Sequence, residues 1–442
     1  MRWLRRHTRL ERIAMPQSTP RPATGYLVGG AVRDALLGRE ARDLDWLVAD
    51  PEAEALRAAA ALGGSAFVLD RARGHWRTVG GGVILDYTPL AGPLEDDLRR
   101  RDFTLNAIAA EPDGHLVDPL DGRGDALARR LRMTSEAALA DDPVRPLRGV
   151  RFAATLALEI APATQQAIVR LSAEQASGGR PKASPERVRD ELEALLADPA
   201  CARGLLLADE LRVLDVVLPV LAACRGVEQG GFHHLDVLRH SLEALNQLVQ
   251  GFPEADAALR WATLLHDVGK PATRSVGEDG RTHFYGHARH GETLALDTLT
   301  RLRFANVLAR RVAALVRYHM LPLPADDKAA RRFVHRRRTL LPDLLKLMIA
   351  DREAARGPLS SEANRRAYRM ALARVLEILD EAPAKPPLLD GEAVMRVHGI
   401  PSGPRVGEAL RLVEEAEAVG DVATPEEAAT LLRRYADAQG WR

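Results

Sequence analysis

The chain has 442 residues, of which 46% are hydrophobic and 28% are charged, and its 62 basic and 61 acidic side chains nearly cancel. This length allows two to four domains with a substantial core, and the composition predicts a globular protein without a membrane span. Any binding to nucleic acid must therefore depend on local basic patches. Two cysteines, Cys201 and Cys224, are too few for a disulfide framework, which favours a cytoplasmic location.

The first twenty residues carry five arginines but lack the apolar stretch of a secretory signal. We interpret residues 1–22 as a disordered tail, or as an extension that precedes a start at Met15. An arm that contacts RNA is the alternative.

Short apolar runs separated by glycines follow in residues 25–120: YLVGG, DLDWLV, SAFVLD, RTVGGGVILDYTPL and LVDPLDG. They predict five strands, with a helix at AVRDALLG between the first two. From Asp141 onward, apolar residues recur at three- and four-residue spacing, for example in ERVRDELEALL and LLKLMIADREAA. This part is expected to be nearly all helix. A proline-rich stretch at residues 381–387 predicts a linker or turn before a last helical segment.

Two aspartates in DLDWLV, Asp43 and Asp45, are the first candidates for chemistry. On a strand they emerge on the same face with Cα atoms about 6.6 Å apart, so one divalent cation can contact both. Leu44, Trp46 and Val48 then occupy the opposite, buried face. The alternative is a pair of solvated carboxylates on an edge strand.

A glycine turn precedes this pair, because Gly29 and Gly30 join the strand YLV to the helix AVRDALLG. Such a turn offers free backbone N–H groups to a phosphate, and Arg33 in the first helical turn adds a charged donor. Asp86, expected at the end of another strand, is a candidate third carboxylate or a simple turn residue. Together these groups predict a triphosphate bound between backbone donors and Mg²⁺.

Five strings in the same order resemble the class II tRNA nucleotidyltransferase and bacterial poly(A) polymerase family. They are GYLVGGAVRDALLG, DLDWLV, RRDFTLNAIA, DPLDG and DDPVRPLRGVRF, within residues 25–152. The resemblance continues through SPERVRDEL at residues 184–192 and PLLDGEAVMRVHGIPSGPRVGEAL at residues 387–410. Asp141 stands where many members carry glutamate, a change that keeps the carboxylate.

The resemblance implies two-metal nucleotidyl transfer, with two Mg²⁺ ions held by the catalytic pair Asp43 and Asp45. It also implies that Asp142 and Arg145 read the incoming base. A carboxylate accepts from the amino group of cytosine or adenine, whereas guanine and uracil present a carbonyl there. The alternative for this pair is a helix salt bridge between residues three apart. Further nucleotide contacts are expected from Arg101 and Asp102, on triphosphate and ribose, and from Asn106, Arg148 and Arg151.

A second series of residues lies in the helical half and resembles the HD phosphohydrolase superfamily. Its H…HD…H…H…D order is carried by His240, His266, Asp267, His287, His319 and Asp351. Imidazole and carboxylate jointly ligate divalent metals, so the resemblance implies one or two metal ions of unidentified kind and hydrolysis of a phosphoester such as a 2′,3′-cyclic phosphate. His283 and His290 are alternatives to His287. A scaffold whose histidines are satisfied by core hydrogen bonds is the other interpretation.

The expected fold class is α+β: a polymerase-β-like nucleotidyltransferase head with a small mixed sheet, followed by an all-α neck, an HD-type body and a helical tail. The expected head spans residues 23–140 and the neck, with the base-reading residues, 141–205. The HD-type domain is expected at residues 206–375 and an RNA-binding tail at 376–442.

The leading functional hypothesis is addition of C, C and A to the 3′ end of tRNA from CTP and ATP. Enzymes that add only A, only CC or a poly(A) tail share these motifs and remain open. From other classes, an HD phosphohydrolase with an RNA-binding N-terminal half, or a pure RNA-binding protein, are alternatives. Basic runs at residues 99–101, 129–132 and 331–338 are candidate phosphate contacts or solvated faces. With aromatics at 4%, recognition of a folded RNA by shape is favoured.

Overall fold

The computed structural model describes residues 11–15, 19–41, 43–230, 233–278, 280–381, 387–398 and 402–441. Most of the predicted tail at 1–22 and of the proline-rich linker lies outside these residues, as do positions 399–401 of the closing motif. The chain divides into two compact units, Met1–Pro219 and Val220–Arg442. In the described ranges no helix combines the length and the apolarity that a bilayer crossing requires.

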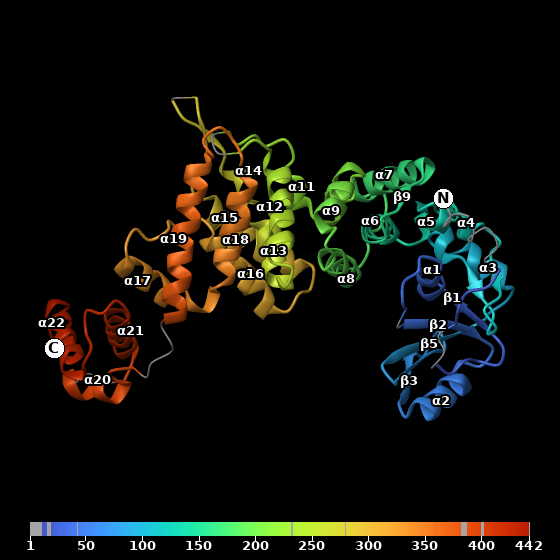
Figure 1. Ribbon diagram of the computed structural model, residues 1–442, viewed down its shortest axis with the longest axis horizontal. Helices are drawn as coiled ribbons and strands as arrows, with labels where there is room; N and C mark the ends of the chain where they lie inside the picture. Colours follow the sequence, from blue (N-terminus) through green and yellow to red (C-terminus); the bar gives the residue numbers. More distant parts are fainter. Residues whose placement is uncertain are drawn as a thin grey trace. The chain divides into compact units, whose positions relative to one another are not determined.

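A seven-stranded mixed sheet organises the first unit, in the order β3-β4-β5-β2-β1-β6-β7. β2 and β5 run parallel, and the other neighbours are antiparallel. This confirms the predicted small mixed sheet (Figure 1). The strands are β1 (Tyr26–Val28), β2 (Asp43–Val48), β3 (Ser65–Asp70), β4 (His75–Gly80), β5 (Val83–Pro89), β6 (Ala109–Ala110) and β7 (Leu116–Val117).

The run RTVGGGVILDYTPL differs from the prediction, because it forms two strands instead of one. β4 ends at Gly80, β5 begins at Val83, and the loop between them is Gly81–Gly82. Both loop glycines have positive φ, 59° and 78°, as a two-residue hairpin turn requires. The chain therefore reverses direction within a single apolar run. On both sides of the turn, successive side chains alternate between the two faces of the sheet.

Helix α2 (Pro51–Leu62) covers one face of the sheet against β3, β4 and β5 (Figure 1). It begins where Asp50 accepts a hydrogen bond from Ala53 N at 3.1 Å, and it ends at Gly63 in the left-handed conformation. Its buried residues Ala55, Ala58 and Ala59 are small, which lets the helix approach the sheet closely. Trp46 and Tyr87 lie in the core that these elements enclose.

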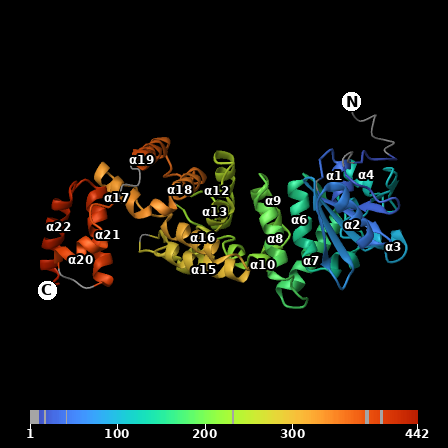
Figure 2. The same ribbon diagram turned by 90° about the horizontal axis from the view of Figure 1, so that it is seen from below.

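The helices of the first unit after α2 include α3 (Leu94–Arg99), which lies between β5 and β6 in the chain, and, after β7, α4 (Gly122–Leu127), α5 (Glu136–Asp141), α6 (Arg145–Thr155), α7 (Pro162–Ala176), α8 (Pro185–Leu196) and α9 (Cys201–Glu210). Helix α6 packs against α8 and α9 (Figure 2). Gly149 lets α6 approach Phe103, because a Cβ there would lie 2.8 Å from Phe103 Cζ. The α6 residues that face the sheet domain are therefore held closely to it.

In the described residues of the second unit, the hairpin β10 (Ser275–Val276) and β11 (Thr282–His283) is the only strand structure, and the other regular elements are helices. Helix α12 packs on α13 and α18, and α15 packs on α16. The helices of this unit include α12 (Val237–Gly251), α13 (Ala257–Leu265), α14 (Lys270–Thr273), α15 (His287–Arg301), α16 (Asn306–Tyr318), α17 (Asp327–Arg337), α18 (Asp343–Ala354) and α19 (Glu362–Glu381). A smaller core joins α20 (Gly391–His398), α21 (Pro404–Ala418) and α22 (Pro425–Ala438).

Candidate functional site

Two acidic side chains emerge together from β2. Asp43 and Asp45 are exposed, whereas Leu44 and Trp46 between and after them are buried, so the two carboxylates share the solvent face as expected. Asp86 lies opposite Asp45 in the parallel register of β2 and β5. Three carboxylates are thereby gathered on neighbouring strands.

Asp86 differs from the prediction in its position and its partner. It lies in the middle of β5 rather than at a strand end, because β5 continues to Pro89. Arg77 on the adjacent strand β4 donates to both of its oxygens, each at 2.7 Å. The charge of Asp86 is thus already matched by a protein cation, whereas Asp43 and Asp45 keep their oxygens open to solvent.

The charge around Asp45 favours a cation. Loss of hydration against the surrounding protein, followed by the negative charges of Asp86 and Asp43, raises the pKa of Asp45 above its usual value, although Arg101 and Arg148 oppose this effect. Carboxylate oxygens are the ligands that Mg²⁺ prefers. The donor set and its crowded negative charge therefore fit a magnesium site.

The glycine turn lies directly beside these carboxylates. Gly29 has a φ of 70° and precedes α1 (Gly30–Leu36). A Cβ at Gly29 would lie 3.2 Å from an Arg101 guanidinium nitrogen and 3.6 Å from Asp45 Oδ2. The turn is therefore next to both the acidic pair and a cation, and a side chain at Gly29 would crowd them.

A polar network holds the cations of this region in place. Arg33 donates to Asn106 Oδ1 at 3.0 Å, and Asn106 in turn donates to Asp102 Oδ1 at 2.9 Å. Asp102 is buried and forms an ion pair with Arg148 at 3.1 Å. Arg101 pairs with an aspartate of α3. Asp102 thus supports the arginines, and both of its oxygens already have protein partners.

Asp142 and Arg145 are close in the chain but do not pair with each other in the described contacts. Asp142 follows α5 in an extended conformation, so the helix salt bridge that was the alternative is not formed. Its oxygens instead accept from Arg187 at 2.9 and 2.5 Å. Arg145 donates to the backbone carbonyls of Ala138 and Arg100.

Arg187 is a residue that the sequence reasoning did not single out, although it lies in the quoted string SPERVRDEL. Partial burial disfavours the charged form of Asp142, but the hydrogen bonds and the charge of Arg187 outweigh this and hold the pKa of Asp142 below its usual value. Asp142 is therefore an ionised acceptor with a fixed orientation.

The predicted basic runs are largely engaged by acidic groups of the protein itself. Arg130 and Arg132 both bind the buried carboxylate of Asp125. Arg332 and Arg336 of α17 both bind Glu415 of α21. These arginines tie elements of the fold together, which favours a structural interpretation of these runs over free phosphate contacts.

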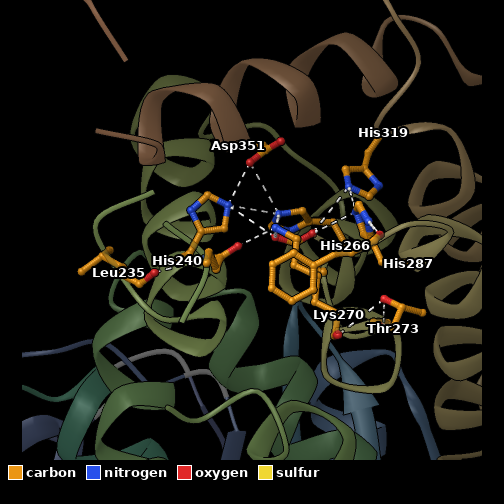
Figure 3. A network of polar contacts seen from close by, with 12 residues as sticks. Leu235, His240, His266, Lys270, Thr273, His287, His319 and Asp351 are labelled. Atoms are coloured by element: carbon orange, nitrogen blue, oxygen red, sulfur yellow. Dashed lines mark hydrogen bonds and ion pairs between the residues drawn. The ribbon is translucent and has the colours of Figure 1, made fainter. Parts of the chain in front are cut away.

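In the second unit, five elements bring the predicted histidines and aspartates together. Figure 3 shows His240, His266, His287, His319 and Asp351 pointing toward one another. They come from α12, the end of α13, the start of α15, the end of α16 and α18. Two triads have ligand atoms close enough to hold a metal: His240, His266 and Asp267, and Asp267, His287 and His319.

The ring orientations in this cluster are fixed by backbone carbonyls. Nδ1 of His266, His287 and His319 lies 2.7–2.8 Å from the carbonyl oxygen three residues earlier. A carbonyl only accepts, so each Nδ1 carries a proton, and each Nε2 faces the cluster, where a neutral ring would offer its lone pair to a metal. This arrangement is typical of metal-ligating histidines.

Asp267 lies between the two triads. Its Oδ2 is 3.2 Å from His266 Nε2 and 2.6 Å from Lys270 Nζ. Its Oδ1 is buried without a hydrogen bond, although His287 Nε2 and His319 Nε2 lie 3.4 and 3.7 Å away. A cation between these atoms would satisfy the carboxylate oxygen and both lone pairs, so the residues fit a divalent metal.

The charge balance supports the same interpretation. Burial disfavours a protonated His266, but the carboxylates of Asp267 and Asp351 outweigh it and raise the pKa of His266 to about 10. The cluster therefore strongly favours positive charge. Of the alternatives to His287, His290 is exposed and His283 stacks on Tyr285, so neither takes its place among the converging side chains.

A mixed sheet with paired aspartates beside a glycine turn, followed by a helical body with an HD cluster, defines a nucleotidyltransferase with a poly(A) polymerase-type head. Family models agree along the chain. They match the poly A polymerase head domain at residues 25–62 and 71–132, the probable RNA and SrmB-binding site of polymerase A at 157–225, and the HD domain at 233–356.

Known proteins extend this similarity over almost the whole chain. An A-adding tRNA nucleotidyltransferase of Deinococcus radiodurans is 54% identical over 96% of this chain and 98% of its own. A CC-adding tRNA nucleotidyltransferase of Thermus thermophilus is 46% identical over 94% of each chain. The solved CCA-adding enzyme of Bacillus stearothermophilus in complex with CTP is 25% identical, with a TM-score of 0.62 over 94% of each chain. The chain belongs to the tRNA nucleotidyltransferase and poly(A) polymerase family.

Proposed function

We propose that this chain adds nucleotides from CTP or ATP to the 3′ end of tRNA by two-metal nucleotidyl transfer. The observation that carries the proposal is the pair Asp43 and Asp45, exposed on one strand face, with Gly29 and Arg101 beside Asp45. A hydroxyl nucleophile, a triphosphate and divalent cations need this combination of carboxylates and cationic donors in one place.

Asp43 and Asp45 would hold the two Mg²⁺ ions. When bound, such ions lower the pKa of an attacking hydroxyl and stabilise a pyrophosphate leaving group. Asp86 acts through Arg77, whose guanidinium it holds beside the acidic pair. Arg33, Arg101 and Arg148 supply the positive charge that orients the triphosphate.

Asp142 and Arg145 select the base in this proposal. The ionised carboxylate accepts from the exocyclic amino group of cytosine or adenine, while Arg145 donates to the neighbouring ring acceptor. A carboxylate offers about four lone-pair positions, so Asp142 can serve a nucleotide while it still accepts from Arg187. Uracil and guanine place a carbonyl against the carboxylate and are repelled.

Two relatives with at least 46% identity over more than nine tenths of this chain favour partial addition over a complete CCA end. The relative that is 54% identical is named as A-adding and the one that is 46% identical as CC-adding. We therefore propose A addition as the first specific activity and CC addition as the second. Full CCA addition, the leading hypothesis from the sequence, is the third outcome of the same experiment.

The experiment supplies tRNA transcripts that end before CCA, after C or after CC with ATP, CTP or both, and sequences the products. An A-adding enzyme extends only the transcript that ends in CC, and only with ATP. Long A tails would instead identify a poly(A) polymerase. The variants Asp43→Asn and Asp45→Asn should abolish addition, with Asp190→Asn, an exposed aspartate of α8, as the control. Unchanged addition in both variants would overturn the catalytic role of the acidic pair. Absence of addition by the unmodified chain would overturn the proposed function and leave a pure RNA-binding protein or an HD hydrolase.

A second activity, metal-dependent hydrolysis of a phosphoester, is favoured by the HD cluster. Its support is the convergence of histidine lone pairs on the orphaned Oδ1 of Asp267. The metal content and the hydrolysis of 2′,3′-cyclic nucleotides and 3′-phosphates should both fall in His266→Ala. His290→Ala, an exposed histidine of α15, is the matched control. Equal metal content and hydrolysis in His266→Ala would leave only the scaffold interpretation.

A further inference from the structure

Three arginines of the first unit meet at one aromatic ring. The guanidinium carbons of Arg33, Arg148 and Arg151 lie 4.8, 5.3 and 4.4 Å from the centroid of Phe152. Arg33 comes from α1 beside the glycine turn, whereas the other two come from α6. Phe152 is 2% exposed, so the ring is enclosed by these side chains and their neighbours.

Like charges at this spacing repel one another, and the ring counters that repulsion. The face of an aromatic ring attracts cations through its quadrupole, and a planar guanidinium packs well on it. A carboxylate in the place of Phe152 would also gather the arginines, but it would cancel their charge and compete with an anionic ligand. An aromatic ring holds them together without adding a further carboxylate to Asp34, Asp102 and Glu191, which already pair with them.

The surrounding contacts fix the ring and the arginines relative to one another. Phe103 packs edge-on against Phe152, with ring centroids 6.0 Å apart and an interplanar angle of 83°. Arg33 and Arg148 are linked through Asn106 and Asp102, and Arg151 is anchored by Glu191 of α8 at 2.5 Å. Arg33 also pairs with Asp34 at 2.9 Å, so each arginine has an acidic partner of its own and shares Phe152 with the others.

We propose that Phe152 is a positioning residue that presents Arg33, Arg148 and Arg151 as one cationic surface for the triphosphate of the incoming nucleotide. The proposal rests on the proposed function, because it takes nucleotides to bind at this site. It assigns to the ring an electrostatic task in addition to its packing in the core.

Fluorination tests this task, because it weakens the quadrupole of a phenyl ring with little change in its shape. Phe152 is replaced in the full chain by mono-, di- and trifluorinated phenylalanine, and KM for ATP and CTP, kcat and the melting temperature are measured. We expect KM to rise stepwise, roughly tenfold in the trifluorinated protein, with kcat and the melting temperature nearly unchanged. The matched control is the same fluorination at Phe304, a buried ring that packs on Trp261 in the second unit. It should leave KM unaltered.

A second measurement separates this proposal from the proposed function. Calorimetry records ATP and CTP binding by the same proteins without tRNA. If fluorination at residue 152 weakens binding while the unmodified chain adds no nucleotide to tRNA, the positioning role stands and the proposed function fails. If the chain adds nucleotides but neither KM nor nucleotide affinity changes across the fluorinated series, only the positioning role is overturned and the proposed function stands. Absence of any nucleotide binding overturns both.

Discussion

The two candidate sites differ in the way their charged groups meet solvent. Asp43 and Asp45 are exposed on a strand face, with arginines held around them. In the HD cluster, His266 and Asp267 are almost fully buried, and three histidine rings are locked by backbone carbonyls. An exposed acidic strand face suits a site where large substrates must enter. Buried histidine nitrogens with fixed orientations suit a tightly held metal.

The most direct test of whether the two sites act independently is to change each site and assay both activities. Asp45→Asn removes one carboxylate charge from the pair Asp43 and Asp45, so nucleotide addition should fall by roughly 10²- to 10³-fold or more. Hydrolysis by the HD cluster should be unaffected, since none of its triads includes this residue. Parallel assays of tRNA extension and cyclic-nucleotide hydrolysis check both halves. Loss of hydrolysis in Asp45→Asn would contradict independent sites.

The reverse change should act on the buried cluster only. His266→Ala removes a lone pair that faces Asp267 and His240, so metal affinity and hydrolysis should fall more than about 100-fold. Nucleotide addition should be retained. Metal analysis of the purified variant, together with tRNA extension, provides the measurement, and a variant with its full metal complement would refute the assignment.

Arg187→Ala should have a smaller effect. It should impair the choice between nucleotides and leave the transfer step itself unchanged. Without its partner, Asp142 loses its fixed orientation, and we expect discrimination against UTP to fall roughly tenfold. Arg187 holds the pKa of Asp142 low, so that pKa rises in the variant. As the pH falls, the variant should then lose selectivity at a higher pH than the unmodified protein. Kinetics with each nucleotide across the acidic range test this, with Arg189→Ala, whose partner is Asp190, as the control.

Gly149→Ala should have the smallest effect on the reaction. The added Cβ would lie 2.8 Å from Phe103 Cζ, and such overpacking lowers the free energy of unfolding by about 1–3 kcal/mol. A few-fold rise in KM for the nucleotide should accompany it, because α6 carries Arg148. Gly251→Ala, where a Cβ meets nothing within 4 Å, should be neutral in urea denaturation. Equal stability of both variants would argue against close packing of α6.

Local patterns were sufficient for much of the fold and for the placement of most candidate residues. The alternation in DLDWLV predicts which side of β2 is buried, and Gly29 and Gly30 predict the turn, because each signal is contained within a few residues. The HD series was predictable because its order along the chain is distinctive.

Partners that come from distant segments could not be read in the same way. Arg77 is only nine positions from Asp86, but it binds both oxygens across a hairpin that the sequence prediction treated as a single strand. The pairing of Asp142 with Arg187 joins residues 45 positions apart. Such contacts depend on how strands and helices pack, and a one-dimensional pattern does not contain that information.

Asp267 has a consequence for how many metal ions the HD cluster could hold. Among the residues that the structure describes, it alone belongs to both triads, giving one oxygen to each side. A substitution at His240 or at His287 would therefore empty half of the cluster, whereas a substitution at Asp267 would empty all of it. The stoichiometry of bound metal across these three variants counts the ions directly, and occupancy of one half must influence the affinity of the other.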